Sequence, residues 1–287
     1  MRGLLIVNSF LNTEKFRDIY SRLDCAFEKL NVTLSMRGNA DFAHAVGSPL
    51  PLFENPDFVL FWDKDILLAR EFEETGIPVF NSSRAIELCD DKRKMHLALT
   101  ELPMPETFIA PMTFPNIGFP DLSFFASIEE NLGYPMVIKE AFGSFGAQVY
   151  LAKNREEALC IIKRCESVPI IFQRFIKESM GRDIRINVVG HKVVSAMERR
   201  SNSDFRSNVT LGGETLHYAP TVEEIALAED ASRRLGLDFG GIDILFGERG
   251  PLICEVNSNT HFKSTCDCTG INLADLIAEH ITKKVAK

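Results

Sequence analysis

Long hydrophobic runs are missing from this 287-residue sequence. The longest apolar stretches, such as residues 58–62, are far too short to span a bilayer. The N-terminus turns polar within a few residues, so we read it as a first strand and not as a signal peptide. The seven cysteines are odd in number, which favours reduced thiols over a disulfide framework. These features exclude a membrane-spanning protein and predict a cytoplasmic one.

Positive charge is also scarce. The chain has 32 Lys and Arg against 40 Asp and Glu, a formal net charge of −8. This balance disfavours a nucleic-acid coat, and we expect neither nucleic acid nor membrane as a partner. The basic residues that do cluster, at 92–94, 199–200 and 206, are spaced like site residues on separate elements.

The sequence lacks a convincing Ser-His-Asp or Cys-His set and a glycine loop that opens a helix. Its glycine loop, Gly143, Ser144, Phe145 and Gly146, lies between two predicted strands. Such a loop can fold over phosphates with its backbone N–H groups, although a tight β-turn explains it equally well. Lys139, at the end of the preceding strand, could reach a phosphate; a solvent-exposed lysine is the alternative.

The predicted elements change character along the chain. Residues 3–80 alternate strand and helix signals, which predicts a small parallel α/β domain. A charged helical region over 82–102 and a Pro-rich linker over 103–120 follow. Beyond them the pattern predicts strands at 134–139 and 169–173, a hairpin at 184–197, and a helix that ends at Gly236.

Three oxygen-bearing side chains stand in two short apolar segments, 241–245 and 252–257, separated by a turn typical of hairpins. Pairing these segments brings Asp243, Glu255 and Asn257 together. Two carboxylates and an amide oxygen suit a magnesium ion that is also held by phosphates. A solvated strand face is the alternative, but unpaired charges among apolar neighbours are costly.

Two further clusters leave alternatives open. The segment 198–208 is rich in arginine, which suits anionic oxygens, although a solvated loop would look similar. His261, Cys266, Asp267 and Cys268 do not follow a familiar zinc spacing. We expect a loop with incidental thiols there, with a zinc or iron site as the alternative.

Several blocks in order resemble the RimK-type ligases of the ATP-grasp superfamily, from about Asp91 onward. The blocks lie at 176–178, 183–185, 198–200, 204–208, 241–245 and 255–257. The resemblance implies an α/β and α+β chain in which two α+β lobes clamp ATP behind a small parallel α/β domain. The implied divisions are 1–88 for the pre-grasp domain, 89–175 for a central subdomain with the glycine-rich lid, and 176–287 for a subdomain with the magnesium site.

The resemblance also implies roles for individual residues. Lys139 and Lys92 match phosphate lysines, Arg174 and Phe175 the adenine stretch, and Asp183 the ribose position. The implied ATP contacts are Lys92, Lys139, Gly143, Ser144, Gly146, Gln173, Arg174, Phe175, Ile176, Asp183, Arg206, Ser207 and Asn208. The implied Mg²⁺ ligands, which we expect to accept Mn²⁺ as well, are Asp243, Glu255 and Asn257. Arg199 or Arg206 would stabilise the transferring phosphoryl group.

The implied reaction joins an amine, such as that of glutamate, to a small-molecule or peptide carboxylate through an acyl phosphate. The family also implies a homo-oligomer. The chain departs from the family at Arg174, where an acidic residue is usual, and after Asn257, where residues 258–265 replace a Pro-Gly turn. These differences leave the acceptor open. A phosphotransferase acting on a hydroxyl and an inactive nucleotide-binding regulator are the alternatives.

Overall fold

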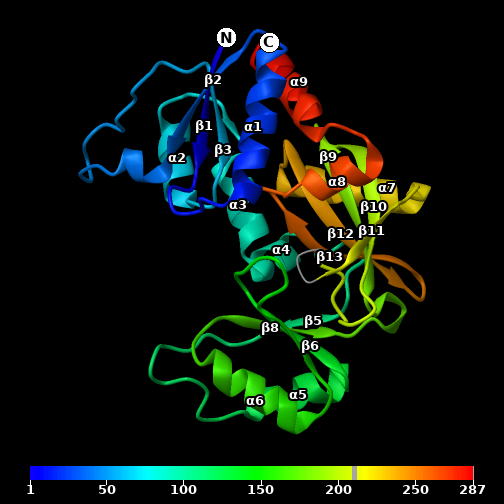
Figure 1. Cartoon of the computed structure of the whole chain (residues 1–287). Coiled ribbons are helices and arrows are strands. Elements are labelled where there is room, and N and C mark those ends of the chain that lie inside the picture. The colour runs from blue at the N-terminus through cyan, green and yellow to red at the C-terminus, as the bar shows by residue number, and fades with distance from the viewer. Residues whose placement is uncertain (209–211, 287) are drawn as a thin grey trace.

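The computed structural model describes residues 1–208 and 212–286 and contains three sheets (Figure 1). The first is parallel, with strand order β2-β1-β3-β4, as the alternating pattern predicted. Its strands are β1 (Arg2–Val7), β2 (Thr33–Gly38), β3 (Phe58–Trp62) and β4 (Val79–Phe80). Helices α1 (Glu14–Glu28) and α2 (Ile66–Glu74) connect them.

Both faces of this sheet are covered at its centre, which explains why β1 and β3 are continuous apolar runs, whereas the edge strand β2 is partly polar. Leu5 and Val7 of β1 share a core with α1, whereas Leu4 and Ile6 share a core with α2. The core on the α1 side also contains residues from the far end of the chain, because α9 (Leu273–Val285) packs beside α1 (Figure 1).

The second sheet is antiparallel, with strand order β5-β8-β6-β7, and lies apart from the others at the bottom of Figure 1. Its strands are β5 (Thr107–Ile109), β6 (Met136–Glu140), β7 (Val149–Ala152) and β8 (Ile170–Arg174). Helices α5 (Ser123–Leu132) and α6 (Arg155–Cys165) bury one face in a single core. Strand β5 lies within the Pro-rich segment that we expected to be a linker or domain edge.

The third sheet is antiparallel, with strand order β11-β10-β9-β12-β13. Its strands are β9 (Arg182–Val189), β10 (Lys192–Arg200), β11 (Glu214–His217), β12 (Phe239–Gly247) and β13 (Gly250–Asn257). Helix α7 (Val222–Leu235) covers it and ends at Gly236, whose φ of 69° is the left-handed value that glycine tolerates. A short 3-10 turn, η2 (Lys177–Ser179), precedes β9, another, η1 (Asn39–Phe42), follows β2, and α8 (Lys263–Thr269) follows the sheet.

The charged helical region after the first sheet is two helices, α3 (Ser83–Asp90) and α4 (Lys92–Ala98). They separate at Asp91, which is extended and caps α4 by accepting from the N–H of Arg93 at 2.9 Å. Both helices share a core with β9, β12 and β13. The domain boundaries after residues 88 and 175 remain a proposal. In the structure, α3 and α4 pack on the third sheet.

Two other parts of the described chain differ from the sequence-based expectation. Glu198, Arg199 and Arg200 belong to strand β10 instead of a charged loop, because this strand continues past Met197 to pair with β11. Strand β6 ends at Glu140, one residue beyond Lys139. Among the described residues, no helix is long and apolar enough to cross a membrane.

Asn81, directly after β4, ties the first sheet to the third. Its side chain is fully buried and donates to the carbonyl groups of Phe239 and Ser258 at 2.9 and 3.0 Å. Its Oδ1 accepts from the backbone N–H groups of Asp238 and Phe239 at 2.7 and 3.3 Å. These four bonds use the whole capacity of the amide, so no smaller or apolar side chain can replace it.

We predict that Asn81→Ala lowers the free energy of unfolding by about 3 kcal/mol, because it leaves buried backbone groups without partners. Urea denaturation measures the loss. Asn131→Ala is the matched control, since Asn131 is exposed on α5 and its side chain donates only to the carbonyl of Ser127. The control is expected to stay within about 0.5 kcal/mol of the parent. Equal stability of the two variants would contradict the role given to Asn81.

Candidate active site

The predicted hairpin is confirmed as β12–β13, and it brings the three oxygen-bearing side chains together. Asp243 lies opposite Glu255 in the register, and Gly241 lies opposite Asn257. The register shifts directly after the Asp243–Glu255 pair, because Ile244 lies opposite Ile253 and Cys254 is left over. This bulge keeps Ile253 in the core while Cys254 and Glu255 line a cavity.

Asp243 belongs to a row of four alternating charges that crosses three strands. Arg199 of β10 binds both carboxylate oxygens of Asp183 at 2.7 and 2.5 Å, and its Nη2 lies 2.9 Å from Asp243. Arg185 binds both oxygens of Asp243 at 2.7 Å. Burial alone would raise the pKa of Asp243, but the two guanidinium groups outweigh it and lower that pKa. Asp243 is therefore held ionised.

Two buried lysines lie beside this row. Lys92 Nζ is 3.3 Å from Glu255 and 3.5 Å from the carbonyl oxygen of Gly143. Lys139 Nζ is 3.5 Å from Cys254 Sγ and forms no ion pair with any residue that the structure describes. Burial and the charges of Lys139 and Lys92 lower the pKa of nearby His96 to about 3. The region is therefore electropositive.

The glycine loop between β6 and β7 rests on the segment that follows β10. Arg206 donates to the carbonyl oxygens of Gly146 and Val149 at 2.5 and 3.3 Å. Gly146 has a φ of 76°, and a Cβ there would lie 2.6 Å from Asn208 Oδ1. Glycine is required both by this backbone and by this close approach.

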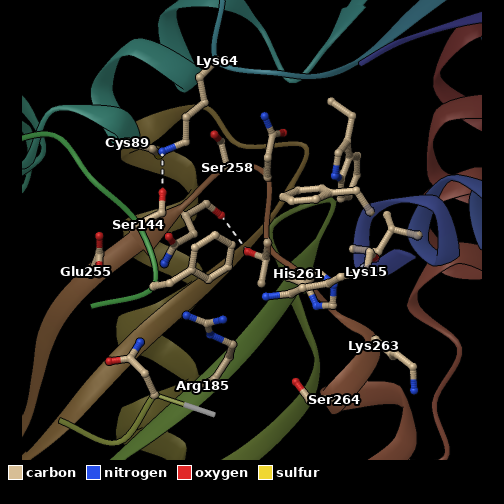
Figure 2. Close-up of a pocket in the computed structure, with 18 of the residues that line it drawn as sticks. Lys15, Lys64, Cys89, Ser144, Arg185, Glu255, Ser258, His261, Lys263 and Ser264 are labelled. Atoms are coloured by element: carbon tan, nitrogen blue, oxygen red, sulfur yellow. Dashed lines mark hydrogen bonds between the residues drawn. The ribbon is translucent and has the colours of Figure 1, made fainter. Parts of the chain in front are cut away.

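The loop also reaches the first domain. Lys64 Nζ is 3.3 Å from Ser144 Oγ, and Lys15 Nζ lies 3.9 Å from the centre of the Phe145 ring. Figure 2 shows the Lys64–Ser144 bond at one side of the cavity and Lys15 entering from α1 at the other. The loop is thus held between the first domain and the third sheet.

Two cavities meet at the charge row. The smaller, of about 100 Å³, lies between the second and third sheets and meets the glycine loop at Gly146. The larger, of about 440 Å³, lies between the third sheet and the first domain and is lined by the other three residues of the loop. The residues that line both are Arg199, Asn208 and Glu255. A ligand that fills the smaller cavity therefore presents one end to a ligand in the larger cavity.

The structure gathers the predicted site residues around these cavities. The smaller cavity is lined by Lys139, Gly146, Gln173, Arg174, Phe175, Ile176, Asp183, Arg199, Arg206, Ser207, Asn208, Asp243 and Glu255. The larger is lined by Gly143, Ser144, Arg199, Asn208, Glu255 and Asn257. Lys92 contacts Glu255 and the carbonyl oxygen of Gly143 in the glycine loop.

Three of these residues have side chains that other protein groups already engage. Arg174 pairs with Glu106 and donates to the carbonyl of Asn131 at 2.8 Å, and its backbone N–H donates to the carbonyl of Glu106 at 2.9 Å, so neither group is free for a ligand. Both oxygens of Asp183 accept from Arg199, although each retains a further lone pair. Gln173 is buried and donates to Thr107 Oγ1 at 2.9 Å.

The sequence did not predict the site residues that come from the first domain, which contains the first sheet. Lys15, Phe16, Ile19, Trp62 and Lys64 line the larger cavity. The sequence could have indicated two of these residues, because ligands of parallel α/β sheets bind at the carboxyl ends of the strands. Trp62 ends β3 and Lys64 follows it, which places both at that edge.

The donor set of the hairpin fits magnesium. Three hydrogen bonds reach Asp243, one on Oδ1 and two on Oδ2, so Oδ1 keeps an open acceptor position. Asn257 Nδ2 is buried without a partner among the described residues, and its Oδ1 accepts no hydrogen bond from them, so this oxygen is available as a ligand. With Glu255 these groups supply the hard oxygen atoms that Mg²⁺ prefers.

The loop after Asn257 places His261 against the first domain. His261 Nε2 donates to the carbonyl oxygen of Lys15 at 3.2 Å, and burial followed by the charge of Lys15 lowers the pKa of His261 to about 4. Cys266 is buried in the core shared with α1. Within residues 1–208 and 212–286, no three His, Cys, Asp or Glu side chains converge on a point that could hold a metal ion.

Comparison with known proteins places this arrangement in a family. A probable alpha-L-glutamate ligase 2 of Shewanella amazonensis is 36% identical over 267 residues, covering 90% of this chain and 85% of that protein. N-acetylaspartylglutamate synthase A of Homo sapiens is 34% identical over 224 residues, and the match covers 76% of this chain but only 56% of the human protein.

Structural comparison agrees. The RimK domain protein ATP-grasp from Sphaerobacter thermophilus superimposes with a TM-score of 0.74 at 22% identity, covering 98% of this chain and 99% of that one. At this identity the likeness shows the fold. A family model described as the RimK-like ATP-grasp domain matches residues 111–281. The chain belongs to the RimK-like family of ATP-grasp ligases.

Proposed function

We propose that the chain is an ATP- and Mg²⁺-dependent carboxylate–amine ligase that uses glutamate or a similar amino acid as the amine. The main support for a nucleotide site is the environment of Lys139. This ammonium group is buried in the wall of the smaller cavity without an ion pair among the described residues, beside Lys92 and a His96 whose pKa is strongly lowered. A buried cation of this kind is costly unless an anion joins it.

The smaller cavity, whose volume of about 100 Å³ holds only part of a nucleotide, is assigned to the adenine end of ATP. The backbone of Phe175 and Ile176 offers N–H and C=O groups to the adenine, and Asp183 retains lone pairs for a ribose hydroxyl. Lys139, Lys92 and the N–H groups of the glycine loop surround the phosphates. The terminal phosphate then lies at the wall that both cavities share.

The reaction proceeds in two steps. An oxygen of the substrate carboxylate attacks the terminal phosphorus, and the bond to the bridging oxygen breaks, which gives an acyl phosphate and ADP. The amine then attacks the acyl carbon, loses a proton and displaces inorganic phosphate. Such transfer requires positioning and charge neutralisation more than covalent help from the protein.

Arg199 is placed to neutralise the transferring group. It lies in the shared wall and is held by Asp183 and Asp243 through Nε and Nη2, which leaves Nη1 directed to no residue among those described. Arg206 has its Nη1 on the loop carbonyl groups and so secures the lid. Arg199 is the stronger candidate for phosphoryl-transfer stabilisation.

Asp243, Glu255 and Asn257 are assigned to Mg²⁺, which supplies charge neutralisation at the phosphate oxygens when bound. We propose that Mn²⁺ also serves, since it accepts the same oxygen ligands. We also propose that the chain forms a homo-oligomer and acts in the cytoplasm.

We predict that Asp243→Asn and Glu255→Gln each lower kcat for ATP-dependent amide formation at least 100-fold, because each removes a charged metal ligand. ADP release measured together with product mass gives both the rate and the linkage. Glu248→Gln is the matched control, since Glu248 is exposed at the turn of the same hairpin. Full amide formation by either site variant would refute the assignment, and a phosphorylated product would replace the ligase with a phosphotransferase.

A second prediction concerns the lid. Gly146→Ala is expected to raise the KM for ATP about tenfold, because the new Cβ meets Asn208 Oδ1 and forces the loop from its position. Gly118→Ala is the control for backbone strain without a side-chain clash, since Gly118 has a φ of 62° but open space around it. A KM for ATP that rises equally in both variants would show that the Asn208 contact is unimportant.

A further inference from the structure

The larger cavity contains one cation that no carboxylate neutralises within the described chain. Of the charged residues that line it, Arg185 pairs with Asp243 and Glu255 with Lys92. Lys64 pairs with Asp90, Lys263 with Asp267, and Arg199 with Asp183 and Asp243. Lys15 has no ion pair among the described residues, and its ammonium group lies against the aromatic face of Phe145.

Lys15 also faces a second positive charge. Arg185 lines the same cavity, and burial together with the charge of Arg185 lowers the pKa of Lys15. The Nε and Nη2 groups of Arg185 bind Asp243, so its Nη1 is the part without a partner among the described residues. Figure 2 shows Lys15 and Arg185 extending toward the middle of the cavity from different elements. Two cations converging on one space repel each other unless an anion lies between them.

The position of Lys15 is fixed from both sides. His261 donates to its backbone carbonyl, and Phe145 of the glycine loop covers its ammonium group. Closing the loop therefore removes water from Lys15, which strengthens its attraction for an anion. The cavity volume of about 440 Å³ is that of a small-molecule site.

We infer that Lys15, together with Arg185, binds a carboxylate group of the amino-acid substrate, which reacts only through its amine. The larger cavity then selects an acidic amino acid. This inference rests on the proposed function, because it names the substrate that the ligase would add. Lys15 is a specificity-determining residue of the first domain, separate from the residues that bind ATP and the metal.

The test compares glutamate with its two monoamides, glutamine and isoglutamine, each of which lacks one carboxylate. With saturating ATP, Lys15→Gln is expected to raise the KM for glutamate at least tenfold while the KM for ATP changes less than twofold. The same rise is expected for the monoamide that keeps the anchored carboxylate, and no rise for the monoamide that has lost it. Lys15→Arg is expected to retain most of the selectivity.

Arg17→Gln is the control on the same helix, because Arg17 is exposed and donates to Asn12 at 2.8 Å outside the cavity. An unchanged KM for glutamate in Lys15→Gln, or an equal rise for all three amino acids, overturns the inference. So does a parent enzyme that prefers glutamine and isoglutamine to glutamate.

Failure of the proposed function is distinguishable from failure of this subsite. If the parent forms no amide with any amino acid, the ligase assignment fails, and calorimetry with ADP, Mg²⁺ and glutamate then decides the subsite. Glutamate binding that weakens at least tenfold in Lys15→Gln supports the subsite. Equal binding by both proteins, or binding by neither, overturns it.

Discussion

The buried row Asp183–Arg199–Asp243–Arg185 is the interaction on which the rest of the site depends. Its members lie opposite one another in the register of β10, β9 and β12, so the sheet brings them together before any ligand arrives. Each charge is neutralised by its neighbours, whereas removing one would leave another buried and unpaired. The row fixes the register of the strands, and through it the position of Glu255 opposite Asp243.

The same row separates two chemical environments. On one side lies the smaller cavity, with Lys139 and Gly146 in its wall. On the other side lies the larger cavity, whose wall is completed by α1 and by the segment after β3. Arg199 and Glu255 belong to both walls, so under the proposed function a phosphoryl group passes from one cavity to the other without leaving the protein. Exclusion of water at such a boundary protects a reactive acyl phosphate.

The grasp lobes could be predicted from the sequence because their site residues stand on regular strands and short turns. The turn at 247–250 and the two-residue spacing of Glu255 and Asn257 were sufficient to predict the hairpin. Strand β5 was missed because proline dominated its segment, and β11 because it pairs only with the end of β10. The part played by Lys15 could not be predicted, since it depends on how the first domain packs against residues more than 200 positions away, such as His261.

Packing of α1 against α9 has a consequence for the order in which the molecule can be assembled. The core under α1 combines Leu5 and Phe27 with Phe239, Ile277 and Ile281. A ribosome must therefore synthesise nearly the whole described chain before this core can close. Until then the apolar face of α1 lacks the partner that covers it in the folded protein.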